Sequence, residues 1–113
     1  MGDIVYVDEE EGKKRLMNNA KLYAKVLAKF KSDTSLADFV AAAGDQDWEK
    51  AQAAAHAIKG VAANLSLIEL ARQSLDVENQ VKGNALSPDS LESLKACYAE
   101  TILQVDKVIA QYA

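Results

Sequence analysis

The chain is poor in the residue types that build most metal centres and disulfide frameworks. Among its 113 residues there are one cysteine, one histidine and one proline. A single cysteine cannot form an internal disulfide or a structural zinc site, so we expect a reducing compartment, the cytoplasm, and no bound metal. A single histidine excludes a multi-histidine metal centre.

An excess of positive charge and a long apolar stretch are also missing. The 17 acidic residues outnumber the 13 basic ones, which gives a formal net charge of -4. This balance argues against a nucleic-acid binder, because such a protein needs a basic face to displace counterions from phosphates. No apolar run approaches the ~20 residues of a membrane span, and no signal peptide opens the chain. We expect neither nucleic acid nor a membrane among its partners.

The spacing of the apolar residues predicts an all-α fold. Between residues 13 and 43 there is no glycine or proline, and apolar residues recur with the 3.6-residue period of a helix throughout the chain. Asp8 with Glu11 forms a capping box that begins a short helix to about Met17. Further helices are expected from Asn19 to about Lys31, from Ser35 to Gly44, from Asp47 to Leu65, from Ser66 to Lys82 and from Ser87 to Tyr112.

Short connections between these helices favour antiparallel neighbours. We therefore predict one domain over residues 1–113, with a core over about 8–112. Its architecture is an antiparallel up-down four-helix bundle, with the short N-terminal helix across one end.

Three residues on one face of the helix expected over 47–65 depart from the pattern. His56 lies about 100° from the core stripe, at ~3.6 residues per turn, and so is expected at the edge of the core or in solvent. Gly60, one turn later, costs roughly 1 kcal/mol relative to alanine in mid-helix. Lys59 shares the face of His56. Each residue alone has an ordinary explanation. His56 and Lys59 could be solvated surface side chains, and Gly60 could relieve the packing of one helix against another. Their combination at fixed spacing predicts a site.

The chemistry that suits these residues is phosphoryl transfer. A neutral imidazole is a good nucleophile near neutral pH, and its nitrogen can carry a phosphoryl group. Lys59 would bring positive charge to the phosphoryl oxygens, and Gly60 would leave room for a partner. The sequence has no glycine-rich nucleotide loop, activating triad or acidic metal cluster. We therefore expect a phosphoryl carrier that is not an enzyme.

The stretch from His56 to Ser66 resembles the signature of the histidine-containing phosphotransfer (HPt) domain. That signature has His, any residue, Leu or Ile, then Lys-Gly, and a further Gly ten residues after the His. The resemblance covers almost the whole chain from Asp8 to Tyr112, with further landmarks at 12–17, 22–30, 47–48, Leu70 and 75–76.

Two residues depart from the pattern of the family. Ser66 stands where the family usually has Gly, and Asp76 replaces the usual Glu. A capping box from Ser66 to Glu69 at a helix junction is expected to account for the first departure.

The resemblance implies a phosphocarrier of a multistep phosphorelay. Such a domain takes a phosphoryl group from an aspartyl phosphate on a receiver domain of a response regulator or hybrid histidine kinase. It holds the group on the imidazole Nε2, here of His56, and passes it to another receiver. The Mg²⁺ belongs to the receiver, so no cofactor is expected on this chain. We expect a monomer that binds its partners weakly through a small interface.

The partner is expected to dock on small or uncharged residues around His56. In relatives a polar residue of the next helix, commonly Gln, lies near the His, and Glu78 takes its place here with Lys82 one turn on. Glu78 either accepts a hydrogen bond from the imidazole, which fixes its tautomer, or forms an ordinary surface pair with Lys82. The residues expected to bind the partner are Gln52, Ala53, Ala57, Ala63, Asn64, Leu67, Glu78 and Lys82.

Two other functions remain open. A helical adaptor that has lost phosphorylation would use the same surface for binding alone, although it would have no reason to keep Gly60 beside His56. The phosphoacceptor domain of a chemotaxis-type histidine kinase shares the fold and motif, although this chain has no ATP-binding domain. Cys97 lies off the main stripe of the last helix and is expected to be a semi-buried residue without a redox role.

Overall fold

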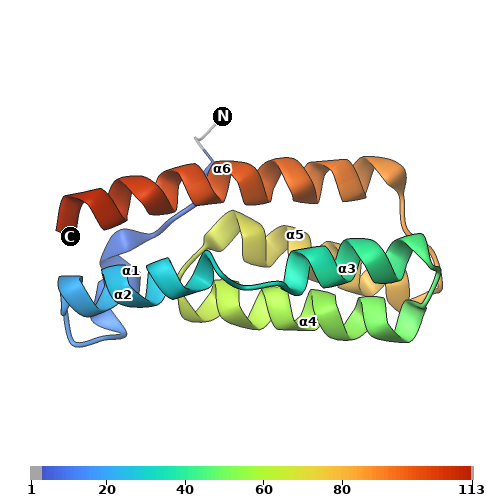
Figure 1. Ribbon diagram of the computed structural model, residues 1–113, viewed down its shortest axis with the longest axis horizontal. Helices are drawn as coiled ribbons and strands as arrows, with labels where there is room; N and C mark the ends of the chain where they lie inside the picture. Colours follow the sequence, from blue (N-terminus) through green and yellow to red (C-terminus); the bar gives the residue numbers. More distant parts are fainter. Residues whose placement is uncertain (1–3, 113) are drawn as a thin grey trace.

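The computed structural model describes residues 4–112, and this range is helical with no strand, as predicted. Six helices are present within it (Figure 1). They are α1 (Glu9–Lys14), α2 (Ala20–Phe30), α3 (Ser35–Gly44), α4 (Trp48–Asn64), α5 (Ile68–Lys82) and α6 (Pro88–Tyr112). None of them combines the length and the apolar character that crossing a membrane would require.

The helices form the predicted bundle, whose first member is divided into α2 and α3 (Figure 1). The chain is interrupted after Phe30, and the Asp33 carboxylate accepts a hydrogen bond from the Ser35 backbone N–H (2.8 Å) before α3 begins. The two halves have different neighbours: α2 packs on α6, whereas α3 packs on α4. The bundle is completed by contacts of α4 with α5 and of α5 with α6, and α1 lies against α2.

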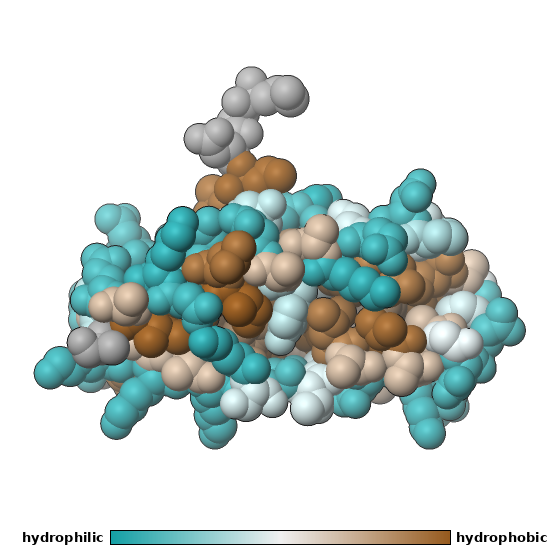
Figure 2. Space-filling model, turned by 45° about the horizontal axis from the view of Figure 1, so that its top comes forward, coloured by the Kyte–Doolittle hydropathy of each residue, from teal (hydrophilic) through white to brown (hydrophobic). Residues whose placement is uncertain are grey.

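The division of α2 and α3 leaves α3 only loosely covered on the side of α6. A cavity of about 540 Å³ lies there, lined by Leu36, Val40 and Tyr98 among others. Figure 2 shows apolar surface on the face where α3 and α6 lie.

Most helix starts follow the predicted capping residues. Asp8, Asn19 and Asp47 each accept a hydrogen bond from the backbone N–H three residues later, at 3.2, 3.0 and 3.2 Å. Ser87 precedes Pro88 at the start of α6 as expected. The start of α3 differs by one residue, since Thr34 rather than Ser35 is its N-cap. The first helix is shorter than predicted and ends at Lys14, because Met17 and Asn18 adopt positive φ angles of 57° and 61°.

The core is centred on large side chains of α2, α3, α5 and α6. Tyr23, Phe39 and Leu94 are fully buried. On α6 the buried line runs through Cys97 and Thr101, one position away from the predicted apolar stripe. Cys97 is thus more deeply buried than predicted, and burial raises the pKa of its thiol despite the nearby Thr101 hydroxyl.

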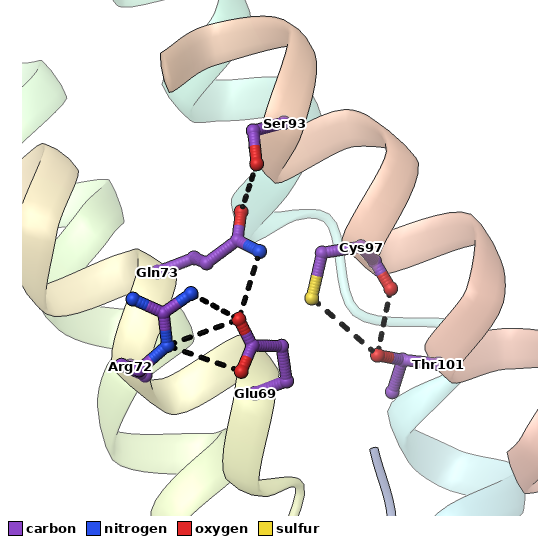
Figure 3. A network of polar contacts seen from close by, with 6 residues as sticks. All are labelled: Glu69, Arg72, Gln73, Ser93, Cys97 and Thr101. Atoms are coloured by element: carbon purple, nitrogen blue, oxygen red, sulfur yellow. Dashed lines mark hydrogen bonds and ion pairs between the residues drawn. The ribbon is translucent and has the colours of Figure 1, made fainter. Parts of the chain in front are cut away.

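A polar network around Glu69 connects α5 with α6 (Figure 3). The Arg72 guanidinium donates to both carboxylate oxygens of Glu69, and Gln73 donates to Oε1 at 3.1 Å. The hydrogen bond from Arg72 lowers the pKa of Glu69 although burial opposes this shift. Gln73 in turn accepts a hydrogen bond from the Ser93 hydroxyl of α6 (2.9 Å). These bonds satisfy a nearly buried carboxylate and hold α5 in register with α6.

The junction between α4 and α5 contradicts the predicted capping box. Ser66 has φ 59°, and its buried hydroxyl has no hydrogen-bond partner. The backbone N–H groups of Ser66 and Leu67 bond to the carbonyls of Ala63 and Ala62, at 3.3 and 2.8 Å. This is a Schellman motif, whose left-handed residue is usually glycine. Ser66 therefore caps the end of α4 rather than the start of α5, and the left-handed backbone explains a glycine preference at this position.

Replacing Ser66 with Gly is expected to stabilise the fold by about 1 kcal/mol, because glycine adopts the left-handed conformation without strain. The substitution also removes a buried hydroxyl that lacks a partner. We expect the thermal midpoint to rise by about 4 °C, measured by circular dichroism. Ala63→Gly in the last turn of α4 is the control and should lower stability by about 1 kcal/mol. A Ser66→Gly variant as unstable as this control would contradict the account of the junction.

Candidate functional site

His56 is presented to solvent by the packing of α4. Ala51, Ala55, Ile58 and Ala62 are buried and fix the rotation of the helix against its neighbours. His56 directly follows one of these positions, and its side chain is 69% exposed. The imidazole is therefore exposed to solvent, as predicted.

Glu78 of α5 lies under the imidazole. It is 3% exposed although it is a charged residue. Its position follows from α5, because the core residues Val77 and Val81 turn this part of the helix toward the bundle. Glu78 Oε2 lies 3.1 Å from His56 Nδ1, and Glu78 Oε1 lies 2.8 Å from Lys59 Nζ. One buried carboxylate thus holds both residues that the sequence singles out on α4.

The contact with Glu78 determines which imidazole nitrogen is free. Burial by itself would raise the pKa of Glu78, but the hydrogen bonds from Lys59 and His56 outweigh burial and lower it. The carboxylate is therefore ionised at neutral pH and can only accept hydrogen bonds. Nδ1 must then carry the proton in the neutral imidazole, and the lone pair lies on Nε2.

Lys59 places a positive charge beside the imidazole. Its side chain is 31% exposed, and its ion pair with the buried Glu78 fixes the direction of the ammonium group. Removal of Glu78 would leave this ammonium half-buried and unpaired, which is costly. The arrangement therefore supplies a fixed cation next to a nucleophilic nitrogen.

Gly60 does not relieve helix packing. It is exposed, and a Cβ atom added to it would meet nothing within 4 Å. The ordinary explanation for a mid-helix glycine is therefore wrong at this position. What the missing side chain leaves is open space on the surface one turn beyond His56.

The residues expected to bind the partner fall into two groups. Ala53, Ala57, Ala63 and Asn64 are exposed on α4, Gln52 is half-buried there, and Lys82 is exposed on α5. Leu67 was expected on this surface, but it is fully buried. The Schellman motif explains the difference, because its last residue packs back onto the helix that the motif ends.

Glu78 likewise offers no docking surface, since it is buried beneath His56. Its predicted hydrogen-bonding contact with the imidazole is present. The alternative, an ordinary surface pair of Glu78 with Lys82, is wrong: within residues 4–112 Lys82 forms no ion pair. The sequence signal for this arrangement is a charged residue directly after the core position Val77.

The sequence reasoning missed the part that α3 plays beside this surface. Asp38 and Ala41 of α3 line a cavity together with Ala53 and Ala57 of α4. A helix of small residues directly before α4 was the available signal, because short connections bring consecutive helices together.

Comparison with known families and proteins bears on this geometry. The Hpt domain family model matches residues 27–104. No curated protein and no solved structure matches the chain significantly. The matched range contains His56, Lys59, Gly60 and Glu78, and it spans more than half of the sequence. The chain therefore belongs to the Hpt domain family.

Proposed function

We propose that this chain is a phosphocarrier of a multistep phosphorelay. It accepts a phosphoryl group on Nε2 of His56 from the aspartyl phosphate of one receiver domain and passes the group to another. Membership of the Hpt domain family supports the broader assignment, a phosphotransfer role in two-component signalling. The observation that supports the finer proposal most is the ionised, buried Glu78 at Nδ1, which leaves Nε2 as the free nucleophile on an exposed imidazole.

The transfer is a single displacement at phosphorus. The Nε2 lone pair of His56 forms the new N–P bond while the bond between phosphorus and the aspartyl oxygen breaks, and the aspartate leaves as a carboxylate. The proton on Nδ1 stays in place, so the ring becomes positively charged. Glu78 stabilises this charge through its hydrogen bond with Nδ1. In the onward step a receiver aspartate attacks the phosphorus and the neutral imidazole is restored.

Lys59 and the receiver share the charge of the transferring group. The Lys59 ammonium is fixed by Glu78 on the same helix face as His56, where it can stabilise the phosphoryl oxygens. Mg²⁺ is expected on the receiver domain. No nucleotide takes part in this step, so the chain acts as a carrier and not as a kinase.

The experiment that tests the proposal is transfer of a radiolabelled phosphoryl group from a panel of purified, phosphorylated receiver domains. We expect label on this chain that is lost in acid and retained in base, as for a phosphoramidate. A receiver whose phosphorylated aspartate is replaced by alanine is the control and should give no label. An adaptor that only binds would take no label, so absence of label with every active receiver would overturn the proposal.

Glu78 is expected to act as a positioning residue. Glu78→Ala should slow phosphoryl transfer by about tenfold, because the imidazole loses its tautomer partner and Lys59 its anchor. Glu78→Gln retains an amide oxygen that can accept from Nδ1 and should restore most of the rate. Stopped-flow or rapid-quench transfer rates measure both variants. A Glu78→Ala variant that transfers at the wild-type rate would remove this role.

Gly60 is expected to lower the stability of the fold but to favour phosphoryl transfer. Gly60→Ala should stabilise the fold by about 0.5–1 kcal/mol, because alanine is the better helix former and the added methyl meets open space. Gly60→Leu should lower kcat/KM for the phosphorylated receiver by about tenfold, since a side chain there displaces the partner from His56. Denaturant unfolding and transfer rates on the same variants check both effects. Unchanged transfer by Gly60→Leu would show that no partner approaches this point.

A further inference from the structure

A groove between α3 and α4 borders the surface that carries His56. It has a volume of about 530 Å³, and its lining includes Ala41 of α3 and Ala53 and Ala57 of α4. These three alanines are exposed. Ala57 is the chain neighbour of His56, and Ala53 lies one turn before it. The groove is therefore continuous with the reacting face.

The groove is mainly acidic. Its lining contains Asp38, Asp45 and Asp47, against the single cation Lys50. Asp47 is already used, because it caps α4 and lies 3.9 Å from Lys50 Nζ. Asp38 and Asp45 are exposed, and neither forms an ion pair with any residue between positions 4 and 112. Two carboxylates without a cationic partner in the described residues thus stand along the α3 side of the groove, although Asp38 accepts a hydrogen bond from the Thr34 hydroxyl at 3.3 Å.

The position of Asp45 works against the stability of the fold. Asp45 is the C-cap of α3, and the last turn of this helix contains no basic residue. A carboxylate at the negative end of a helix dipole is unfavourable. Local arrangements that oppose stability are expected where a residue serves binding.

Resting on the proposed function, we propose that the α3–α4 groove receives a basic helix of the partner receiver domain. Asp45 lies seven positions after Asp38, about 10.5 Å along a helix at ~1.5 Å per residue. A partner helix with Lys or Arg two turns apart matches this spacing. The aliphatic stems of those side chains lie over the alanines, and their charged ends reach the two carboxylates. The groove thereby selects among receivers by the charge of this helix.

The test uses the receiver domain that phosphorylates the wild-type chain. The double variant Asp38→Asn/Asp45→Asn should raise KM for the phosphorylated receiver about fivefold at low salt, the size expected for the loss of two exposed ion pairs. The value of kcat at saturation should stay within about twofold, because His56, Lys59 and Glu78 are untouched. The KM of the variant should also depend less on salt than that of the wild type.

The matched control is Glu10→Gln/Glu92→Gln, which changes the net charge equally at exposed positions outside the groove. It should leave KM within about twofold of the wild type, as charges distant from an interface are screened. Equal KM values for the two double variants would overturn the inference. Amide shifts of Ala41 and Ala53 on titration with the unphosphorylated receiver would support it. A chain that no receiver labels would instead overturn the proposed function and this inference with it.

Discussion

Replacement of His56 by Gln is expected to abolish phosphoryl acceptance while leaving the fold intact. His56 is the only histidine of the sequence, so no second imidazole can take over the role. Its side chain is 69% exposed and contributes little packing, so the free energy of unfolding should change by less than about 0.5 kcal/mol. Glutamine can still donate a hydrogen bond to Glu78, but its amide nitrogen has no nucleophilic lone pair.

The measurement is label transfer from the phosphorylated receiver, together with thermal unfolding of the same sample. We expect background label on the His56→Gln variant and an unchanged midpoint. Lys59→Ala provides the comparison: it keeps the nucleophile and should still be labelled, but more slowly. Wild-type labelling of His56→Gln would place the phosphoryl group elsewhere in the chain.

Gly12→Ala is expected to destabilise the fold by about 2–3 kcal/mol, although alanine is the better helix former. A Cβ atom on Gly12 would come within 2.5 Å of Cε1 and the hydroxyl oxygen of Tyr23. The ring cannot move aside, because Tyr23 is fully buried and its hydroxyl donates to the Leu65 carbonyl at 2.8 Å. Burial raises the pKa of Tyr23 to about 12, so this hydroxyl remains a donor across the physiological range.

Chemical denaturation measures this effect, and Gly60→Ala is its matched control. The same substitution meets open space at Gly60 and should stabilise the fold. The two Gly→Ala substitutions are thus expected to change the free energy of unfolding in opposite directions. A Gly12→Ala variant as stable as Gly60→Ala would show that Tyr23 is not confined by α1.

The sequence predicted the order of the helices and most of their starts, because caps and apolar periodicity are local signals. It failed where a local signal had two interpretations. The serine of the pair Ser66–Glu69 can begin a helix as a capping residue, but here the backbone of Ser66 ends the preceding helix in the left-handed conformation. Leu67 was consequently placed on the surface, whereas it belongs to the core.

Polar residues at inward positions were the other source of error. Ser74 is fully buried on α5, whereas its apolar neighbour Leu75 is 45% exposed. On α6 the buried line runs through Cys97 and Thr101. A pattern that counts only apolar residues moves to the neighbouring face when the true face contains polar ones.

The candidate site could be predicted in part for the same physical reason. His56, Lys59 and Gly60 are close in the sequence on one helix, so their common face follows from helix geometry alone. The bond of Glu78 to both His56 and Lys59 depends on how α5 is rotated against α4. The resemblance to the HPt domain implied a contact between Glu78 and His56 but left its alternative, a surface pair with Lys82, open. The groove between α3 and α4 depends on tertiary packing and could not be predicted from either helix alone.

The most direct test of the account is to locate the phosphoryl group on the labelled chain. Nuclear magnetic resonance of the phosphorylated, ¹⁵N-labelled protein at alkaline pH resolves which imidazole nitrogen is bonded to phosphorus. Because Glu78 holds Nδ1, the account predicts one phosphoryl group per chain, bonded to Nε2 of His56. A phosphorus bonded to Nδ1, or to any residue other than His56, would contradict it.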